Sequence, residues 1–142
     1  LDIIMSINKS KIKNIHASGI SVLTNKTDIA NARIVFEDNC VCNLSSSRIS
    51  DKIERKMRVF QKNSYFSLDY QNSSLGTYKK IKNKNVISIE KKEKSFPQND
   101  SLKDEIDSFV KCIKNNKKAV VDASDGLNAL TYALKISNLI KK

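Results

Sequence analysis

The stretch from Ala30 to Tyr70, ANARIVFEDNCVCNLSSSRISDKIERKMRVFQKNSYFSLDY, contains the patterns that decide the fold. In its first half, apolar positions alternate with outward-facing ones, which is the period of two expected of a strand with one buried face. Asp38-Asn39 interrupts the alternation, and both residues tolerate a left-handed backbone, so a two-residue hairpin turn is predicted. The inward positions of this first hairpin are Ala32, Ile34, Phe36, Cys40, Cys42 and Leu44.

A second hairpin follows in the same stretch. Its strands alternate in the same way, and Lys62-Asn63-Ser64 provides the turn between them. Its inward positions are Met57, Val59, Phe66, Leu68 and Tyr70. Four such strands in succession predict an antiparallel meander with one face committed to a core. The predicted fold class is therefore α+β, a predominantly antiparallel open β-sheet with helices packed on one face.

The flanking segments supply the remaining elements. Residues Lys13 to Leu23 read as a strand, in which Gly19 indicates a bulge or a close backbone approach. Two more strands are predicted from Thr77 to Ile81 and from Val86 to Glu90, joined by a turn at 82–85. Apolar spacing then predicts an amphipathic helix from about residue 102 to 115 and a second from about 122 to 141. These two helices are expected to cover the sheet.

Length and charge limit the class of protein. A chain of 142 residues with 39% hydrophobic and 29% charged residues is expected to form one folded domain, 1–142. The net charge of +11 has two interpretations. It indicates either a surface for nucleic acid or anionic lipid, or lysines dispersed over solvated faces. The dispersion of the lysines and the scarcity of Arg favour the second interpretation, so no nucleic-acid partner is predicted.

Cysteine content and hydropathy bear on the compartment. Three cysteines at Cys40, Cys42 and Cys112, without disulfide-like spacing, favour a reducing compartment and buried thiols rather than a metal site. No apolar run is long enough for a membrane span, and no signal peptide is visible, so a cytoplasmic protein is predicted. The chain does not begin with Met, which suggests a piece of a longer protein.

The second strand of the first predicted hairpin ends in an unusually polar segment. Ser45, Ser47 and Arg48 lie in the segment NLSSSRIS, where hydroxyls and a guanidinium can bind a polyhydroxylated or phosphorylated ligand. The alternative is a polar strand end with Arg48 paired to Glu54 or Asp51. His16, the single histidine, has no sequence neighbours that suggest a triad, and is interpreted as a surface residue.

Three segments carry a resemblance to a known family. They read N-A-R-I-V-F-E-x-x-C-V-C-N-L-S-S-S-R-I-S, then R-K-M-R-V-F-Q-x-x-x-Y-F-S-L-D-Y, and S-L-x-x-E-I-x-x-F-V at the start of the helical region. Together they resemble the C-terminal domain of the glucose-fructose oxidoreductase/inositol dehydrogenase/MocA (Gfo/Idh/MocA) family of NAD(P)-dependent oxidoreductases. The resemblance spans nearly the whole chain, and it rests on a sheet pattern rather than on a catalytic signature.

The resemblance implies a function for a longer parent protein. Such enzymes transfer hydride between NAD or NADP and a sugar, cyclitol or nucleotide sugar, and their sheet also mediates homo-oligomer formation. The nucleotide-binding domain and the catalytic Lys and His fall before Leu1, while Asp2 lies where the Asp of an H-x-x-D pattern would fall. No catalytic, cofactor-binding or metal residue is therefore expected in this chain. Ser45, Ser47 and Arg48 remain as predicted substrate-binding residues.

The sequence lacks a glycine-rich phosphate loop, which agrees with cofactor binding by a separate nucleotide-binding domain. The chain has only 3 Gly and no G-x-G-x-x-G motif, so a Rossmann phosphate turn is not predicted. By itself the chain is expected to bind no cofactor and to be inactive. Two alternatives remain open from the sequence, a standalone sheet-mediated oligomerisation domain and a basic nucleic-acid-binding module.

Overall fold

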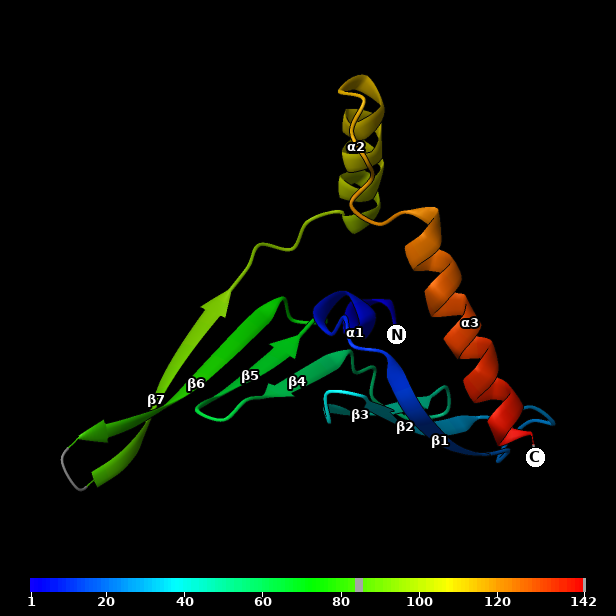
Figure 1. The fold of residues 1–142 in the computed structure, drawn as a ribbon, viewed down its shortest axis with the longest axis horizontal. Helices are drawn as coiled ribbons and strands as arrows, with labels where there is room; N and C mark the ends of the chain where they lie inside the picture. Colours follow the sequence, from blue (N-terminus) through cyan, green and yellow to red (C-terminus); the bar gives the residue numbers. More distant parts are fainter. Residues whose placement is uncertain (84–85, 142) are drawn as a thin grey trace. The chain divides into compact units, whose positions relative to one another are not determined.

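The computed structural model describes residues 1–83 and 86–141, apart from the side chain of Asn83. The chain divides into two compact units, one made of Leu1–Ser50 with Ser108–Lys142 and the other of Asp51–Asp107. The elements, drawn in Figure 1, are α1 (Asp2–Ile7), β1 (Ile12–Ile20), β2 (Ile29–Phe36), β3 (Val41–Ser47), β4 (Lys56–Phe60), β5 (Ser64–Asp69), β6 (Ser74–Asn83), β7 (Val86–Ser95), α2 (Ser101–Lys114) and α3 (Ala123–Ile140). The predicted α+β class with antiparallel sheets is confirmed.

The first unit is built on an antiparallel sheet of order β1-β2-β3. The alternation predicted for β2 is confirmed, because Ala32, Ile34 and Phe36 are buried and the residues between them are not. Ile15 of β1 joins them, at the position paired with Ile34. This inward row is the centre of the core.

The hairpin between β2 and β3 differs from the prediction by one residue. Asn39 N–H donates to the Phe36 carbonyl and Phe36 N–H donates to the Cys40 carbonyl, so the loop has three residues, 37–39. Asn39 adopts the left-handed conformation, with φ of 65°. A turn closed by one left-handed residue is a common three-residue hairpin loop. Because the loop takes up Glu37, Cys40 lies outside the strand and is exposed, so its predicted burial is wrong.

Helix α3 covers the core face of this sheet. Its Tyr132, Ile136 and Leu139 pack against the core, and α1 packs beside it. The predicted close approach at Gly19 is confirmed, because a Cβ there would lie 2.6 Å from Cγ2 of Ile140. Only glycine therefore lets the last turn of α3 rest on β1.

The start of α3 is fixed by its own sequence. The Asp122 carboxylate accepts hydrogen bonds from the backbone N–H groups of Ser124 and Asp125, and the Asp125 side chain accepts one from the Asp122 N–H. Lys118 Nζ lies 2.5 Å from Asp122 Oδ2. Hydrogen bonds from Lys118, Ser124 and the Asp125 backbone hold the pKa of Asp122 well below its usual range. This capping box confirms the helix start predicted from the acidic residues.

The second unit contains an antiparallel sheet of order β4-β5-β6-β7. The predicted second hairpin is present, with Phe60 paired to Tyr65. The predicted four-strand meander is wrong in one respect, because β2-β3 and β4-β5 belong to two sheets rather than one. Strands β6 and β7 are longer than predicted, and part of the predicted turn at 82–85 lies outside the described residues.

Helix α2 forms where the apolar spacing predicted it. Its apolar side chains remain exposed: Leu102, Ile106, Phe109, Val110 and Ile113. Among the described residues, no helix is both long and apolar enough to cross a lipid bilayer.

Candidate functional site

Two of the three predicted site residues lie on β3. Ser45 and Ser47 are both exposed, and because they are two residues apart they share one side of the strand. Ser45 Oγ donates to Asn31 Oδ1 at 2.7 Å, whereas Ser47 Oγ accepts a 3.3 Å bond from the Ile49 N–H. Ser45 therefore belongs to the open face of the first sheet, and Ser47 lies at the rim of that face.

Arg48 has a different environment. Its Nε donates to Asp28 Oδ1 at 2.6 Å, and its Nη2 donates to Thr24 Oγ1. The partner is thus Asp28 rather than the predicted Glu54 or Asp51. The Arg48–Asp28 ion pair links the end of β3 to the loop between β1 and β2. About half of the Arg48 side chain remains exposed.

Asp28 is the polar centre of that loop. Only 3% of the residue is exposed, and its Oδ2 accepts from the N–H groups of Val22, Leu23 and Thr24 at 2.7–3.0 Å. Burial raises the pKa of the carboxyl, but these backbone hydrogen bonds and Arg48 outweigh burial. The pKa of Asp28 is consequently held well below its usual range, and the carboxylate stays charged.

The open face of the first sheet carries two transverse rows of polar side chains. Antiparallel register aligns His16 with Arg33 and Arg33 with Asn43 in the first row. It aligns Ser18 with Asn31 and Asn31 with Ser45 in the second. Arg33 Nη1 donates to Asn43 Oδ1 at 3.1 Å, so the rows are bonded across strands. The rows line an open hollow of about 340 Å³.

This hollow contains hydroxyls, amides, one guanidinium and one imidazole, and its lining includes no carboxylate. Such a set donates and accepts hydrogen bonds, which suits a polyol, a phosphate or a polar protein surface. The prediction that His16 is a surface residue is confirmed: it is exposed, and its Nε2 lies 2.9 Å from Asn14 Nδ2. Its alignment with Arg33 was not visible in the sequence, because register between β1 and β2 depends on the loop between them.

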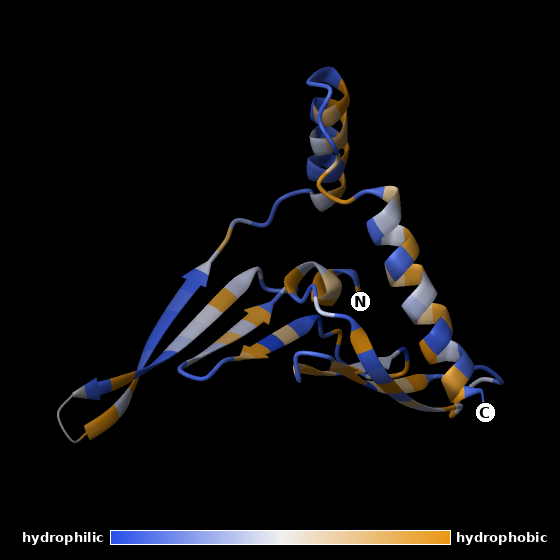
Figure 2. Cartoon of the chain, viewed as in Figure 1, coloured by the Kyte–Doolittle hydropathy of each residue, from blue (hydrophilic) through white to orange (hydrophobic). Residues whose placement is uncertain are grey.

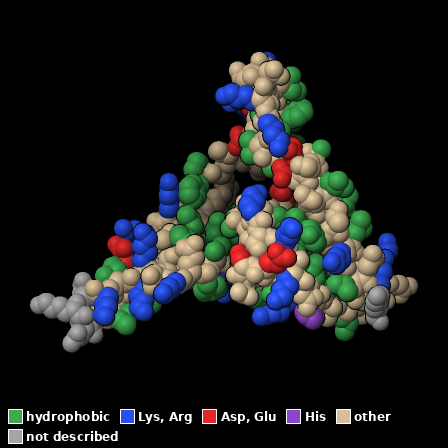
Figure 3. Space-filling view, viewed as in Figure 1, with side chains coloured by type: hydrophobic (Ala, Val, Ile, Leu, Met, Phe, Trp, Pro, Cys, Tyr) green, Lys and Arg blue, Asp and Glu red, His purple; other side chains and the backbone are tan. Residues whose placement is uncertain are grey.

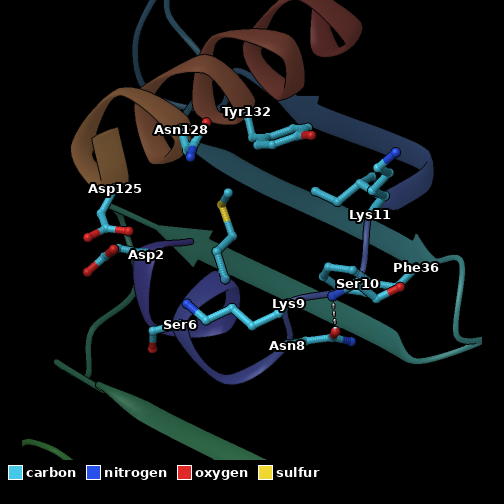
Figure 4. A pocket seen from close by; sticks show the side chains of 12 residues that line it. Asp2, Ser6, Asn8, Lys9, Ser10, Lys11, Phe36, Asp125, Asn128 and Tyr132 are labelled. Atoms are coloured by element: carbon cyan, nitrogen blue, oxygen red, sulfur yellow. Dashed lines mark hydrogen bonds between the residues drawn. The ribbon is translucent and has the colours of Figure 1, made fainter. Parts of the chain in front are cut away.

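A second cavity lies where α1, residues 8–12 and α3 meet (Figure 4). Its volume is about 250 Å³. Asp2 from α1 and Asp125 from α3 lie at one end, and Asn128 and Tyr132 project into it from α3. Carboxylate, amide and phenol groups around a concave space are what sugar hydroxyls require.

The cavity also has a basic side. Lys9 and Lys11 line it, and the segment between them is held by a 2.8 Å bond from the Ser10 N–H to Asn8 Oδ1 (Figure 4). Asp125 is already engaged in the capping box of α3, whereas Asp2 lies at the position that the family resemblance gives to the Asp of the H-x-x-D pattern.

The second unit holds an aromatic ladder, defined here as Phe60, Tyr65 and Tyr78. The Phe60 and Tyr65 rings are stacked with their centroids 4.8 Å apart, and the Tyr65 and Tyr78 rings are stacked with their centroids 4.6 Å apart. The sequence of β6 and β7 alone offered only Tyr78; the cross-strand register adds the other two rings. Both faces of Tyr65 are covered by its neighbours, so the ladder stabilises the sheet as cross-strand aromatic pairs do.

The face shown in Figure 3 shows how the basic side chains are distributed. On the face shown in Figure 3, Lys and Arg side chains are spread over several elements. Within residues 1–83 and 86–141, no group of three or more His, Cys, Asp or Glu side chains is placed to bind a metal ion. The three cysteines are free thiols.

Comparison with known proteins shows what this chain is similar to. No family model matches it. It is 25% identical over 138 residues to the UDP-N-acetylglucosamine 3-dehydrogenase of Acidithiobacillus ferrooxidans, a Gfo/Idh/MocA enzyme, and the match covers 96% of this chain. The chain is thus similar, over nearly its whole length, to a Gfo/Idh/MocA enzyme. The relationship predicted from the sequence is thereby confirmed.

Solved structures agree on the fold. Two crystal forms of the same dehydrogenase superpose on 98% of the chain with TM-scores of 0.89 and 0.84, at 24% identity. The chain spans less than half the length of this Gfo/Idh/MocA relative, 44% of it.

Proposed function

We propose that this chain is the C-terminal substrate-binding and dimerisation domain of an NAD(P)-dependent oxidoreductase acting on a nucleotide sugar in the cytoplasm. The observation that carries the proposal is the sequence match, over 138 residues, to a protein named UDP-N-acetylglucosamine 3-dehydrogenase. In the parent enzyme the nicotinamide would accept or donate a hydride at a secondary alcohol or ketone of the sugar. The protein's contribution is to bind and orient the two reactants.

The residues of this chain do not fit the cofactor. A dinucleotide phosphate turn needs glycines in a tight loop before a helix. The three glycines here lie inside β1, β6 and α3, and none has a positive φ. The cofactor is therefore assigned to the nucleotide-binding domain that the family resemblance implies for the parent protein.

Two features of the first unit support a role in substrate binding. The cavity beside α1 combines Asp2 with amide and phenol groups from α3. The open face of the sheet offers Ser45 with Ser47 at its rim, while Arg48 holds the adjoining loop. We assign Ser45 and Ser47 to direct substrate contact and Arg48 to positioning of this strand end. The rest of the polar open face is assigned to pairing with a second copy, as the resemblance implies.

The parent protein provides the decisive test. When the chain is expressed with the coding sequence that precedes Leu1, we expect a glycine-rich nucleotide fingerprint and reduction of NAD or NADP with UDP-N-acetylglucosamine, followed at 340 nm. The 142-residue chain alone is expected to give no turnover and no saturable binding of NADH in a fluorescence titration. Micromolar NADH binding to the chain alone, or an upstream sequence without a nucleotide fold, would contradict the proposal.

The substrate-binding assignment predicts a specific kinetic change in the parent. Ser45→Ala should raise KM for the nucleotide sugar by about threefold to tenfold with kcat little changed, since it removes one hydrogen bond. Ser46→Ala is the matched control, because Ser46 lies on the same strand and points to the other side. Equal KM values for the two variants would remove Ser45 from the site.

A further inference from the structure

The open face of the first sheet contains few charged groups. Hydrophobic and hydrophilic residues follow one another along β1 (Figure 2), and alternation together with strand register assigns every second side chain of the three strands to this face. These side chains are Asn14, His16, Ser18 and Ile20 from β1, Ile29, Asn31, Arg33 and Val35 from β2, and Val41, Asn43, Ser45 and Ser47 from β3. None of these described side chains is a carboxylate, and Arg33 carries the permanent positive charge among them.

Arg33 forms a hydrogen bond within this face rather than a salt bridge. Its Nη1 donates to Asn43 Oδ1 at 3.1 Å, and His16 lies opposite it on β1. Within residues 1–83 and 86–141, the arginine that forms a salt bridge is Arg48. A guanidinium has five N–H donors, so most of those of Arg33 remain available to a ligand in the adjoining hollow.

Pairing with a second copy would bury this charge. An interface between two identical copies is isologous, so each copy places the same open face against the other. Arg33 then meets a surface of the first sheet on which none of the described side chains is acidic. A buried charge without a partner is strongly unfavourable, and like charges that face each other are unfavourable as well. The pairing assigned to this face therefore requires an anion that neither sheet supplies.

We propose that the row of His16, Arg33 and Asn43 binds a phosphate group, which neutralises the open face when two copies pair across it. The inference rests on the proposed function, to which the pairing and the nucleotide sugar belong. Phosphate suits this row because a guanidinium can donate two parallel N–H bonds to it, and an imidazole and an amide can donate others. The phosphate is either free in solution or part of the nucleotide sugar, whose proposed contact Ser45 lines the same hollow.

The single histidine of the chain gives a direct probe of this site. In the 142-residue chain, titration with inorganic phosphate at constant pH and ionic strength should shift the NMR resonance of the His16 Hε1 proton saturably. Arg33→Gln should weaken this binding by at least about tenfold, since it removes charge-assisted hydrogen bonds. Arg58→Gln is the matched control, at an exposed arginine of the second unit, and should leave the binding unchanged. Absence of a saturable shift, or equal binding by the two variants, would overturn the site.

UDP in place of inorganic phosphate distinguishes the two sources. Tighter binding of UDP than of phosphate, lost in Arg33→Gln, would assign the site to the nucleotide sugar. Equal binding of the two would assign it to free phosphate.

Light scattering measures the effect of phosphate on pairing. At equal ionic strength, the Kd of the dimer should be at least about tenfold lower in phosphate than in chloride, and Arg33→Gln should remove this difference. A dimer of equal stability in both salts would overturn the inference and leave the proposed pairing standing. A chain that is monomeric in both salts would contradict the pairing itself, and the His16 titration would then decide on the phosphate site alone.

Discussion

Replacing Phe36 by alanine is expected to lower the free energy of unfolding by about 3–5 kcal/mol. Phe36 is 1% exposed and, with Ile34, is the most deeply buried large side chain of the core. Removing its ring deletes apolar contacts and leaves a cavity that the surrounding strand and helix cannot close without moving. Urea unfolding of the 142-residue chain, followed by far-UV circular dichroism, measures the change.

Phe60→Ala is the matched control for this experiment. The same atoms are removed, but Phe60 is 73% exposed and contributes mainly its stacking contact with Tyr65. Phe60→Ala should lower the free energy of unfolding by about 1 kcal/mol or less. If both variants lose the same stability, the core does not lie on the inward face of β2 and the assignment of the first unit is wrong.

The second large effect is expected at Asp28. Asp28→Asn replaces a buried carboxylate that accepts from three backbone N–H groups, from the Thr24 hydroxyl and from Arg48. An amide has one acceptor oxygen and no charge, so some of these donors lose their partner. The midpoint of thermal unfolding should fall by about 5–10 °C. Asp51→Asn, at an exposed aspartate, should change it little.

The effect of Asp28 should depend on pH in a defined direction. Its pKa is lowered in the folded state, so its contribution to stability is complete above the unfolded value of about 3.9 and is lost as the pH falls below it. The difference in unfolding midpoint between the natural chain and Asp28→Asn should therefore be constant at pH 5–7 and shrink below about pH 4. A difference that stays constant down to pH 2 would show that the carboxylate charge is not what stabilises the loop.

Local features of the fold were predictable from the sequence because short-range chemistry determines them. The inward row of β2, the left-handed residue at Asn39 and the capped start of α3 each depend on residues within a few positions. The length of the hairpin loop was not predictable. Glu37 fits a strand and a turn equally well by alternation, and only the hydrogen bonds across Phe36 decide between them.

Long-range features were beyond the sequence patterns. Arg48 pairs with an aspartate twenty positions earlier, although four acidic residues lie closer along the chain. The rows that contain His16 and Ser45 depend on strand register, which one residue of slippage would reverse. The division of the strands into two sheets was also missed, because periodicity describes each hairpin and not how hairpins pair. The residue types of the candidate site could therefore be predicted from the sequence. The partner of Arg48 and the cavity beside α1 could not.

The division into two units affects how the chain folds during its synthesis on the ribosome. The first unit is interrupted by residues 51–107, and its covering helix is made last. At elongation rates of about 5–20 residues per second, the inward face of the first sheet waits roughly 5–19 s after its synthesis until α3 is complete. During that interval Ile34 and Phe36 have no native cover, while the intervening unit can already close. The nascent chain is thus most prone to misassembly, and most in need of a chaperone, while its middle third is being synthesised.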